Sequence, residues 1–142
     1  MKKQGSILIE VVASVMILTL TTTFIIGASI QNSDILKERI ILEEVNRAVD
    51  NLTNEFKYNI SKDKIEELLI DDKIGFKYDS DFSKRLLDKS ITELERGGDI
   101  EVIKLGEDSI GLKLKIQANI INENSEVSIE NEFTKSWWMD EI

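Results

Sequence analysis

The hydrophobic pattern of the chain begins with one long apolar run near the N-terminus. Residues 11–33 form a stretch of 23 residues without a charged side chain, and Lys2, Lys3 and Glu10 precede it. A helix of about 20 apolar residues is long enough to cross the hydrocarbon core of a bilayer, which is about 30 Å thick. The run therefore predicts one transmembrane helix.

The helical pattern continues after the charged residues return. Apolar residues recur at spacings of three and four, which is typical of a helix with one buried face. These positions are Ile41, Val45, Ala48, Leu52 and Phe56. If residues 6–58 form one helix, it is about 80 Å long at about 1.5 Å per residue. We expect its second half to pack on a globular head.

Two short elements are predicted after this helix. Residues 63–69 predict a helix with Asp63 as its N-cap. The next apolar residues alternate with Gly75 and Lys77, and a period of two predicts a strand. The apolar positions of that strand are Ile74, Phe76 and Tyr78.

A further helix is expected before the glycine pair at positions 97 and 98. Asp79 or Ser80 would start this helix, and Gly97 with Gly98 would end it. Its apolar positions are predicted to lie on one side, and they are Phe82, Leu86, Leu87, Ile91 and Leu94.

The last third of the chain predicts an antiparallel meander. Strands are expected at residues 100–105 and 110–120, with a turn at 106–109 between them and another turn at 122–125. In the strand at 110–120 the even positions are apolar and the odd positions are polar or glycine. In the last strand, a shared apolar face is expected for Val127, Ile129, Phe133 and Trp137. On the opposite face, Lys113 and Lys115 are expected across from Glu130 and Glu132.

A meander with one apolar face needs a cover, and the helical stripe at residues 41–56 can supply it. The predicted fold class is therefore α+β. A long N-terminal helix, membrane-spanning in its first half and amphipathic in its second half, packs on a C-terminal antiparallel β-meander.

The residues in front of the apolar run form a motif. Two lysines are followed by Gly5, and Glu10 stands five residues after that glycine. A carboxylate at the edge of hydrocarbon costs free energy and usually marks a function. This motif resembles the start of type IV prepilins and the related pseudopilins.

The resemblance implies that a prepilin peptidase cuts after Gly5. Ser6 is then the new N-terminus and the site of N-methylation, and Glu10 is the fifth residue, which acts in subunit assembly. The chain departs from the family pattern at Ser6, where an apolar residue is more common, and at Gly27, where many members have proline. The resemblance covers roughly the first thirty residues, and a long helix laid across a meander is the fold that it implies.

Two other interpretations of the N-terminus fit these residues less well. A secretory signal peptide has an apolar core of about 7–15 residues followed by a small-residue cleavage site. This run is longer, although the small residues at positions 27–29 resemble such a site. The second alternative is a plain membrane anchor in which Glu10 occurs by chance.

Charge and length define the domains. We expect a leader at residues 1–5, a transmembrane and assembly helix at 6–33 and an extracytoplasmic head at 34–142. Of 18 basic and 27 acidic residues, 16 and 26 follow Ser33, which gives the head a net charge of −10. Such a head repels phosphate backbones, so no nucleic-acid partner is expected. Lys2 and Lys3 favour the cytoplasmic side, which places the head outside the cytoplasmic membrane.

The composition restricts the chemistry. The chain has no Cys and no His, and therefore lacks the commonest metal ligands and the commonest general base. Residues 79–83 resemble the start of a calcium loop, but the motif fails because Lys84 and Ser90 occupy the places of its Gly and Glu. We therefore expect no enzyme, no metal and no cofactor.

Trp137 and Trp138 are the unusual feature of the C-terminal tail. In one interpretation, one of them completes the sheet core and the other caps the strand. In the other, both contact a neighbouring subunit, because aromatic residues are enriched at interface hot spots.

Two functions from different classes follow from these patterns. The first is a structural subunit of a type IV pilus-like filament, and the atypical Ser6 favours a minor subunit. Its partners would be other pilin subunits, the prepilin peptidase and the membrane, before the protein joins a cell-surface filament. The second is a single-pass, membrane-anchored extracytoplasmic binding or sensor module. The motility, adhesion, DNA-uptake and secretion roles of such filaments are not distinguished by the sequence.

Overall fold

The computed structural model describes residues 2–122 and 125–140 of the chain. It divides into two compact units, Met1–Arg39 and Ile40–Ile142. The first unit is helical throughout its described part, and the second unit, called the head below, contains a four-stranded sheet. The fold is α+β, as predicted.

The long helix α1 covers Lys2–Asn54, and the π-helical turn η1 (Glu55–Asn59) follows it directly. The expectation of one helix over residues 6–58 is thus confirmed, although its last turn is π-helical. The helix also includes the residues of the expected leader that the structure describes. Met1 lies outside the described residues.

Short elements connect α1 to the sheet. The helix α2 covers Lys62–Leu68, the strand β1 covers Lys73–Phe76, the helix α3 covers Phe82–Asp88, and the 3₁₀ turn η2 covers Ile91–Glu93. Three strands follow, β2 (Ile100–Glu107), β3 (Gly111–Asn122) and β4 (Ser125–Ser136), and the 3₁₀ turn η3 (Trp137–Asp140) follows β4.

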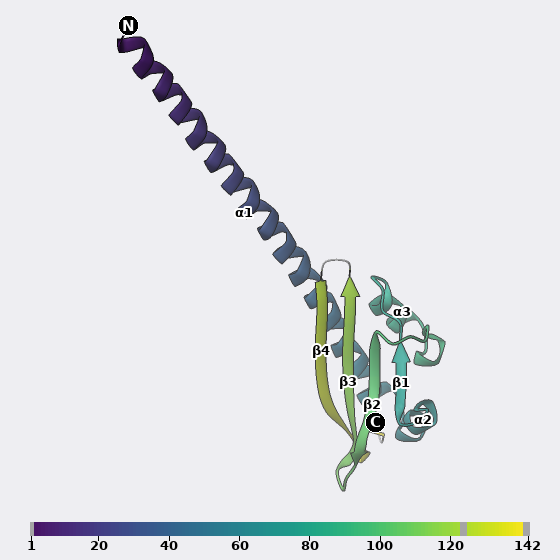
Figure 1. Cartoon of the computed structure of the whole chain (residues 1–142). Helices are drawn as coiled ribbons and strands as arrows, with labels where there is room; N and C mark the ends of the chain where they lie inside the picture. Colours follow the sequence, from purple (N-terminus) through teal and green to yellow (C-terminus); the bar gives the residue numbers. More distant parts are fainter. Residues whose placement is uncertain (1, 123–124, 141–142) are drawn as a thin grey trace. The chain divides into compact units, whose positions relative to one another are not determined.

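The sheet is an antiparallel meander with the order β1-β2-β3-β4 (Figure 1). The pairing of β3 with β4 runs without a register shift from Asn122–Ser125 to Gly111–Ser136. A Cβ atom on Gly111 would lie 2.0 Å from the carbonyl oxygen of Lys135, so only glycine allows the strands to approach at that end. Glu123 and Asn124, in the expected turn, lie outside the described residues.

The head core forms where the end of α1 covers one face of the sheet. The predicted stripe is confirmed, because Val45, Ala48, Leu52 and Phe56 are completely buried and Ile41 packs at the margin. The apolar face of β3 lies opposite and is also completely buried over Leu112, Leu114, Ile116 and Ala118. Side chains from α2, β1 and α3 close the core, and they are Ile65, Ile74, Phe76, Phe82 and Leu86.

Two polar contacts fix η1 and the end of α1 to β4. Asn131 donates a hydrogen bond from Nδ2 to the Thr53 hydroxyl at 3.0 Å, and Thr53 donates to the Val49 carbonyl at 2.8 Å. Lys135, which is 1 % exposed, donates from Nζ to the Lys57 carbonyl oxygen at 2.6 Å. The last carbonyls of a helix lack partners within the helix and attract cations. The buried ammonium therefore caps the C-terminal end of the helix.

Several details of the sequence prediction are wrong. The N-cap position of α2 is Ser61 instead of Asp63, and β1 ends before Tyr78. The single helix expected up to residue 97 is interrupted, because the backbone is extended at Lys89 and Ser90 between α3 and η2. Leu87 therefore points to solvent, 81 % exposed, while Ile91 and Leu94 reach the core through the 3₁₀ turn.

The sheet also differs in detail from the prediction. The strand β2 extends to Glu107, with a bulge between Lys104 and Gly106, and Ile110 precedes β3 and is exposed. Lys115 lies opposite Glu132 as expected, but its ion pair, at 2.9 Å, is with Glu130 on the diagonal. Lys113 instead pairs with Asp108 at 2.8 Å.

The adjacent residues Leu86 and Leu87 test this account of the core. We expect a fragment of residues 34–142 to fold without metal or disulfide. In that fragment, Leu86→Ala should lower the free energy of unfolding by about 2–5 kcal/mol, because Leu86 is buried. Leu87→Ala should change it by less than about 0.5 kcal/mol, because Leu87 is exposed. Urea unfolding followed by circular dichroism measures both values, and equal losses would contradict the packing of α3.

Candidate functional site

The residues of the N-terminal motif all lie within α1. Gly5, Ser6 and Glu10 are exposed, and Ser6 and Glu10 are four residues apart. Residues four apart on a helix lie on the same face, one turn from each other. The α-amine that cleavage would create at Ser6 therefore lies on the same face of the helix as the Glu10 carboxylate.

Gly5 has no role in the fold of its own chain. A Cβ atom placed on it would meet nothing within 4 Å, and its backbone does not adopt a positive φ. Glycine inside a helix destabilises it by roughly 1 kcal/mol relative to alanine. Local structure therefore gives no reason for glycine at position 5, which is consistent with a requirement set by another protein.

The apolar part of the first unit has no apolar cover within the described structure. Its large hydrophobic side chains are all exposed, and they run from Ile7 to Ile30 around the whole helix. This helix is long and apolar enough to cross a membrane by length and composition. It is therefore compatible with a membrane anchor, and in water its surface would need another apolar partner.

The hydroxyl groups between residues 14 and 23 of the helix are satisfied internally. Thr22 and Thr23 donate to the carbonyl oxygens four residues earlier, both at 2.8 Å, and Thr19 and Thr21 do the same at 3.0 Å. Ser14 donates to the Glu10 carbonyl at 2.7 Å. A polar group that is hydrogen-bonded within its own helix can enter hydrocarbon at low cost. The Glu10 carboxylate is different, because no hydrogen bond or ion pair joins it to the side chains that the structure describes.

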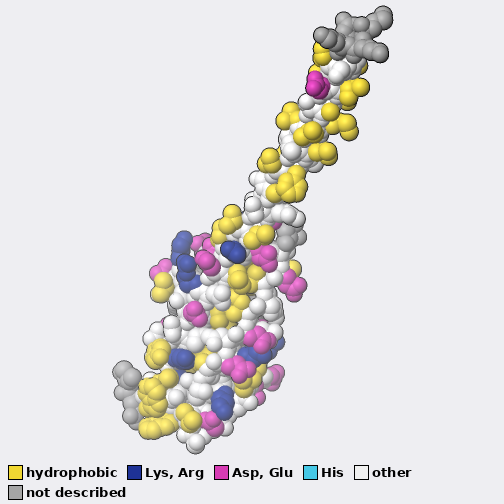
Figure 2. All heavy atoms as spheres, turned by 90° about the vertical axis from the view of Figure 1, so that its left-hand side faces the viewer, with side chains coloured by type: hydrophobic (Ala, Val, Ile, Leu, Met, Phe, Trp, Pro, Cys, Tyr) yellow, Lys and Arg dark blue, Asp and Glu magenta, His cyan; other side chains and the backbone are white. Residues whose placement is uncertain are grey.

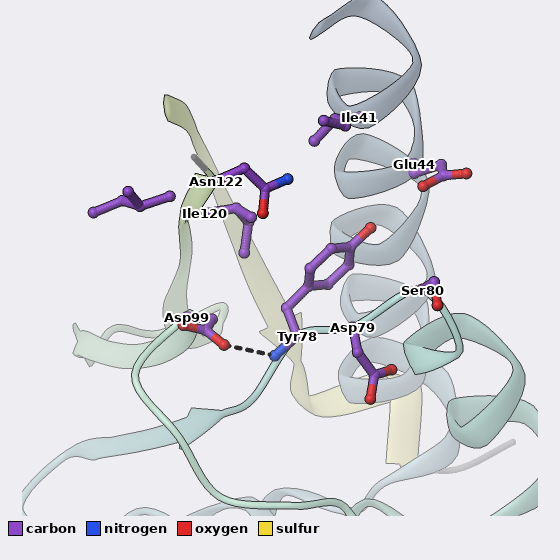
Figure 3. A pocket seen from close by; sticks show the side chains of 9 residues that line it. Ile41, Glu44, Tyr78, Asp79, Ser80, Asp99, Ile120 and Asn122 are labelled. Carbon is purple, nitrogen blue, oxygen red and sulfur yellow. Dashed lines mark hydrogen bonds between the residues drawn. The ribbon is translucent and has the colours of Figure 1, made fainter. Parts of the chain in front are cut away.

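The head contains a hollow of about 250 Å³ between α1, the loop after β1 and the end of β3. The Tyr78 ring stands between Ile120 of β3 and the Ile41 and Glu44 side chains of α1 (Figure 3). Burial raises the pKa of Tyr78 above its ordinary value of 10, and the nearby Glu44 and Asp79 carboxylates raise it further. The phenol is therefore protonated near neutral pH.

Structural contacts already occupy two of the three carboxylates around this hollow. Asp99 accepts a hydrogen bond from the Tyr78 backbone N–H at 2.9 Å, and Asp79 pairs with Arg85 at 2.7 Å. Glu44 is the third carboxylate. The Asp79 and Asp99 carboxylates therefore already serve contacts within the head.

The two tryptophans lie in η3, directly after β4. Trp137 is 60 % exposed and Trp138 is 46 % exposed, so the interpretation in which Trp137 completes the sheet core is wrong. The buried position at this end belongs to Lys135, and the chain leaves the strand after Ser136. The backbone N–H of Trp137 donates a hydrogen bond to the Ile110 carbonyl at 3.3 Å, so the exposed Ile110 lies beside Trp137.

Exposed hydrophobic side chains gather at one end of the head (Figure 2). Trp137, Trp138 and the neighbouring Ile110 are about half exposed or more. The interface role of the two tryptophans stays a prediction, and this exposure is consistent with it. The sequence prediction missed the inward position of Lys135, although the odd positions from Val127 to Phe133 continue to it with a period of two.

The comparison of the chain with protein-family models, with curated proteins and with solved structures finds no match. The function must therefore be argued from the residues and from the geometry described above.

The turn at residues 108–111, between β2 and β3, gives a testable electrostatic prediction. The Asp108 carboxylate accepts hydrogen bonds from the Ile110 and Gly111 N–H groups at 2.9 and 3.1 Å and pairs with Lys113. The Lys113 ammonium, followed by these two N–H groups, lowers the pKa of Asp108 from 3.8 to about 2. A lowered pKa in the folded state stabilises the fold above the unfolded pKa, and this stabilisation is lost as pH falls toward the folded pKa.

We therefore expect Asp108→Asn to lower the stability of the 34–142 fragment by a constant amount above about pH 5. The difference from the parent should shrink as pH falls from about 4 to 2, where the parent also loses the charge. Urea titrations at a series of pH values measure this difference. Lys113→Gln, which removes the largest cause of the shift, should narrow the pH window, and a difference that grows toward pH 2 would refute the assignment.

Proposed function

We propose that this protein is a structural subunit of a type IV pilus-like filament, processed after Gly5 and assembled through its apolar N-terminal helix. The observation that carries the proposal is Glu10. It is the one carboxylate at the entrance of an apolar helix that is exposed on all sides, and it lacks a partner among the described side chains.

The first support comes from the junction of Gly5 and Ser6. This junction is exposed, and Gly5 serves no purpose in the fold. A membrane-embedded peptidase that cuts after a glycine would explain why the costly residue is kept there. In the proposed sequence of events, Lys2 and Lys3 hold the leader on the cytoplasmic side until cleavage.

The second support comes from electrostatics. Cleavage frees an α-amine on Ser6, and α-amines have an ordinary pKa of about 7.7–8.0 and are mostly cationic near neutrality. An isolated charge in an apolar bundle costs several kcal/mol, whereas an opposite charge at close range offsets that cost. The amine of an incoming subunit can therefore pair with Glu10 of a neighbour, and this pairing would select the axial register of the helices.

The third support is the apolar surface itself. Lipid covers the helix before assembly, and the helices of neighbouring subunits cover it in a filament. The head folds around its own core, so it can remain outside the membrane and then on the filament surface. The atypical Ser6 favours a minor subunit of such a filament.

The alternative is a single-pass, membrane-anchored binding or sensor module with the head outside. The exposed apolar helix fits this function equally well. An anchor, however, gains nothing from a carboxylate at its entrance or from a glycine that the fold does not need. Cleavage and the behaviour of Glu10 variants separate the two functions.

Processing is tested by the mass of the protein extracted from membranes of the native host. We expect the mature chain to begin with Ser6 and to carry one added methyl group on its amine. Gly5→Val should leave the chain uncleaved and still in the membrane, because a β-branched side chain replaces the glycine that the peptidase would read. Gly27→Val is the matched control and should be cleaved normally, and a mature start near residue 30 would contradict the proposal.

Assembly is tested by Glu10→Gln, which keeps the size of the side chain and removes its charge. We expect normal cleavage and membrane insertion, with incorporation into sheared surface filaments reduced by about tenfold or more, because the amine loses its partner. Glu43→Gln, an exposed change further along α1, should enter filaments like the parent. Quantitative immunoblots of membrane and filament fractions give both values. If Glu10→Gln enters filaments as well as the parent, the assembly role of Glu10 is refuted.

A further inference from the structure

The outer edge of β4 is a long unpaired strand edge. β4 is the last strand in the order of the sheet, and it pairs with β3 over its whole length, Ser125–Ser136. Within residues 2–122 and 125–140, no other strand lies on its outer side (Figure 1). A free edge presents backbone N–H and C=O groups that can pair with another strand.

The outward-facing backbone groups belong to the even-numbered residues. The backbone N–H of Trp137 donates a hydrogen bond to the Ile110 carbonyl across the β3–β4 ladder. The odd-numbered residues of β4 therefore exchange backbone hydrogen bonds with β3. In an antiparallel ladder these bonds alternate, and the intervening residues direct their groups to the other side. The residues with outward groups are Glu126, Ser128, Glu130, Glu132, Thr134 and Ser136.

The edge is held in a regular extended form. The inward side chains of Val127 and Phe133 are buried, and Asn131 and Lys135 are hydrogen-bonded to α1 and η1. The pairing with β3 has no bulge, and the sequence contains no proline. Two of the usual features that protect an edge, bulges and prolines, are therefore missing from β4. A partner strand would meet a preformed template.

The charges on the edge disfavour a second copy of the same strand. Like charges directly opposite each other destabilise an antiparallel pair. When two copies of β4 are paired in antiparallel registers that align nearly all of their even positions, two glutamates always lie directly opposite each other. The opposed pair is Glu130 with Glu130, Glu130 with Glu132, or Glu132 with Glu132, depending on the register. The edge therefore selects against pairing of β4 with itself.

We propose that the β4 edge accepts an extended strand of a different protein chain, and that this strand carries lysine or arginine at alternate positions. Basic side chains opposite Glu132, Glu130 and Glu126 would face all three carboxylates in one antiparallel register, and at Glu130 the partner would share the carboxylate with Lys115. The exposed Trp137 and Trp138 follow at the end of the edge and add apolar contact area there. This proposal does not depend on the filament function, because it concerns the head alone.

The probe is the peptide TVKVKVTVK, whose three lysines lie opposite Glu132, Glu130 and Glu126 in the antiparallel register. Its partner in the experiment is the full chain in detergent micelles, and anisotropy of a label on the peptide measures the dissociation constant. We expect at least tenfold tighter binding than for TVEVEVTVE. A form of the lysine peptide that carries a methyl group on the backbone nitrogen of each lysine should bind at least tenfold more weakly. These backbone N–H groups could then no longer donate hydrogen bonds to the outward carbonyl groups of β4.

The matched variants are Glu132→Pro and Glu132→Thr. Both remove the same charge, but only proline removes the outward N–H group, and proline is tolerated at such edge positions. We expect Glu132→Pro to bind the lysine peptide at least fivefold more weakly than Glu132→Thr does. The triple variant Glu126→Lys, Glu130→Lys and Glu132→Lys should prefer the glutamate peptide.

Three results would overturn the proposal. The first is equal binding by the two Glu132 variants together with equal binding of the methylated and unmethylated lysine peptides. That result would mean that charge attraction alone, without backbone pairing, holds the peptide. The second is absence of binding to the parent protein. The third is self-association of the parent chain that Glu132→Pro abolishes, which would make a second copy the occupant. If Glu132→Pro does not fold, the N-methylated peptide decides between the first result and the proposal.

Discussion

Burial of one face of α1 against the sheet is the contact on which the head depends. The five side chains Val45, Ala48, Val49, Leu52 and Phe56 are at most 1 % exposed. Burial of an aliphatic or aromatic side chain contributes about 1.5–3 kcal/mol, so this face contributes on the order of the whole stability of a small domain. Without it, the inner face of β2 and β3 would be open to water. The same helix must also remain stable further toward the N-terminus, where its side chains are exposed on every side.

The contacts at the end of α1 decide which part of the sheet remains available. Lys135 and Asn131 tie β4 to the helix end, and Gly111 allows β3 to approach β4 closely at the same place. These polar contacts help to hold the last strand in register, although its outer side has no neighbouring strand among the described residues. At the opposite margin of the sheet, β1 is only four residues long and is bridged to Ile70 and Arg96. The two edges therefore differ in length and in accessibility.

The sequence predicts those parts of the fold in which a period repeats several times. The stripe at residues 41–56 and the alternation at 110–120 each repeat several times, and both elements form with the predicted faces buried, except that Ile110 precedes β3 and is exposed. The prediction fails where local backbone geometry interrupts a pattern. Leu87 fits the apolar side of a long helix, but the extended Lys89 and Ser90 end that helix early. Trp137 fits the inward period of β4, but the 3₁₀ turn begins at that residue and directs it outward, and Lys135 is buried instead because the helix end needs a cation. Gly5 and Glu10 stand out in the sequence, and the described residues give neither side chain a packing partner.

The N-terminal helix and the β4 edge would recognise their proposed partners by different physics. Apolar surface attracts without direction, since its contribution depends on the area removed from water and not on register. A helix that is apolar on all sides therefore gains little preference for one register from its apolar surface alone, and in the proposed filament the charge of Glu10 would make one position preferred. A strand edge works in the opposite way, because its backbone hydrogen bonds already fix a spacing of two residues. At the β4 edge the three glutamates would therefore determine only which partner strand binds, because they attract basic side chains and repel acidic ones. In both proposals acidic side chains would supply what the apolar or backbone contacts lack: Glu10 would set the register of the helix, and Glu126, Glu130 and Glu132 would select the strand partner.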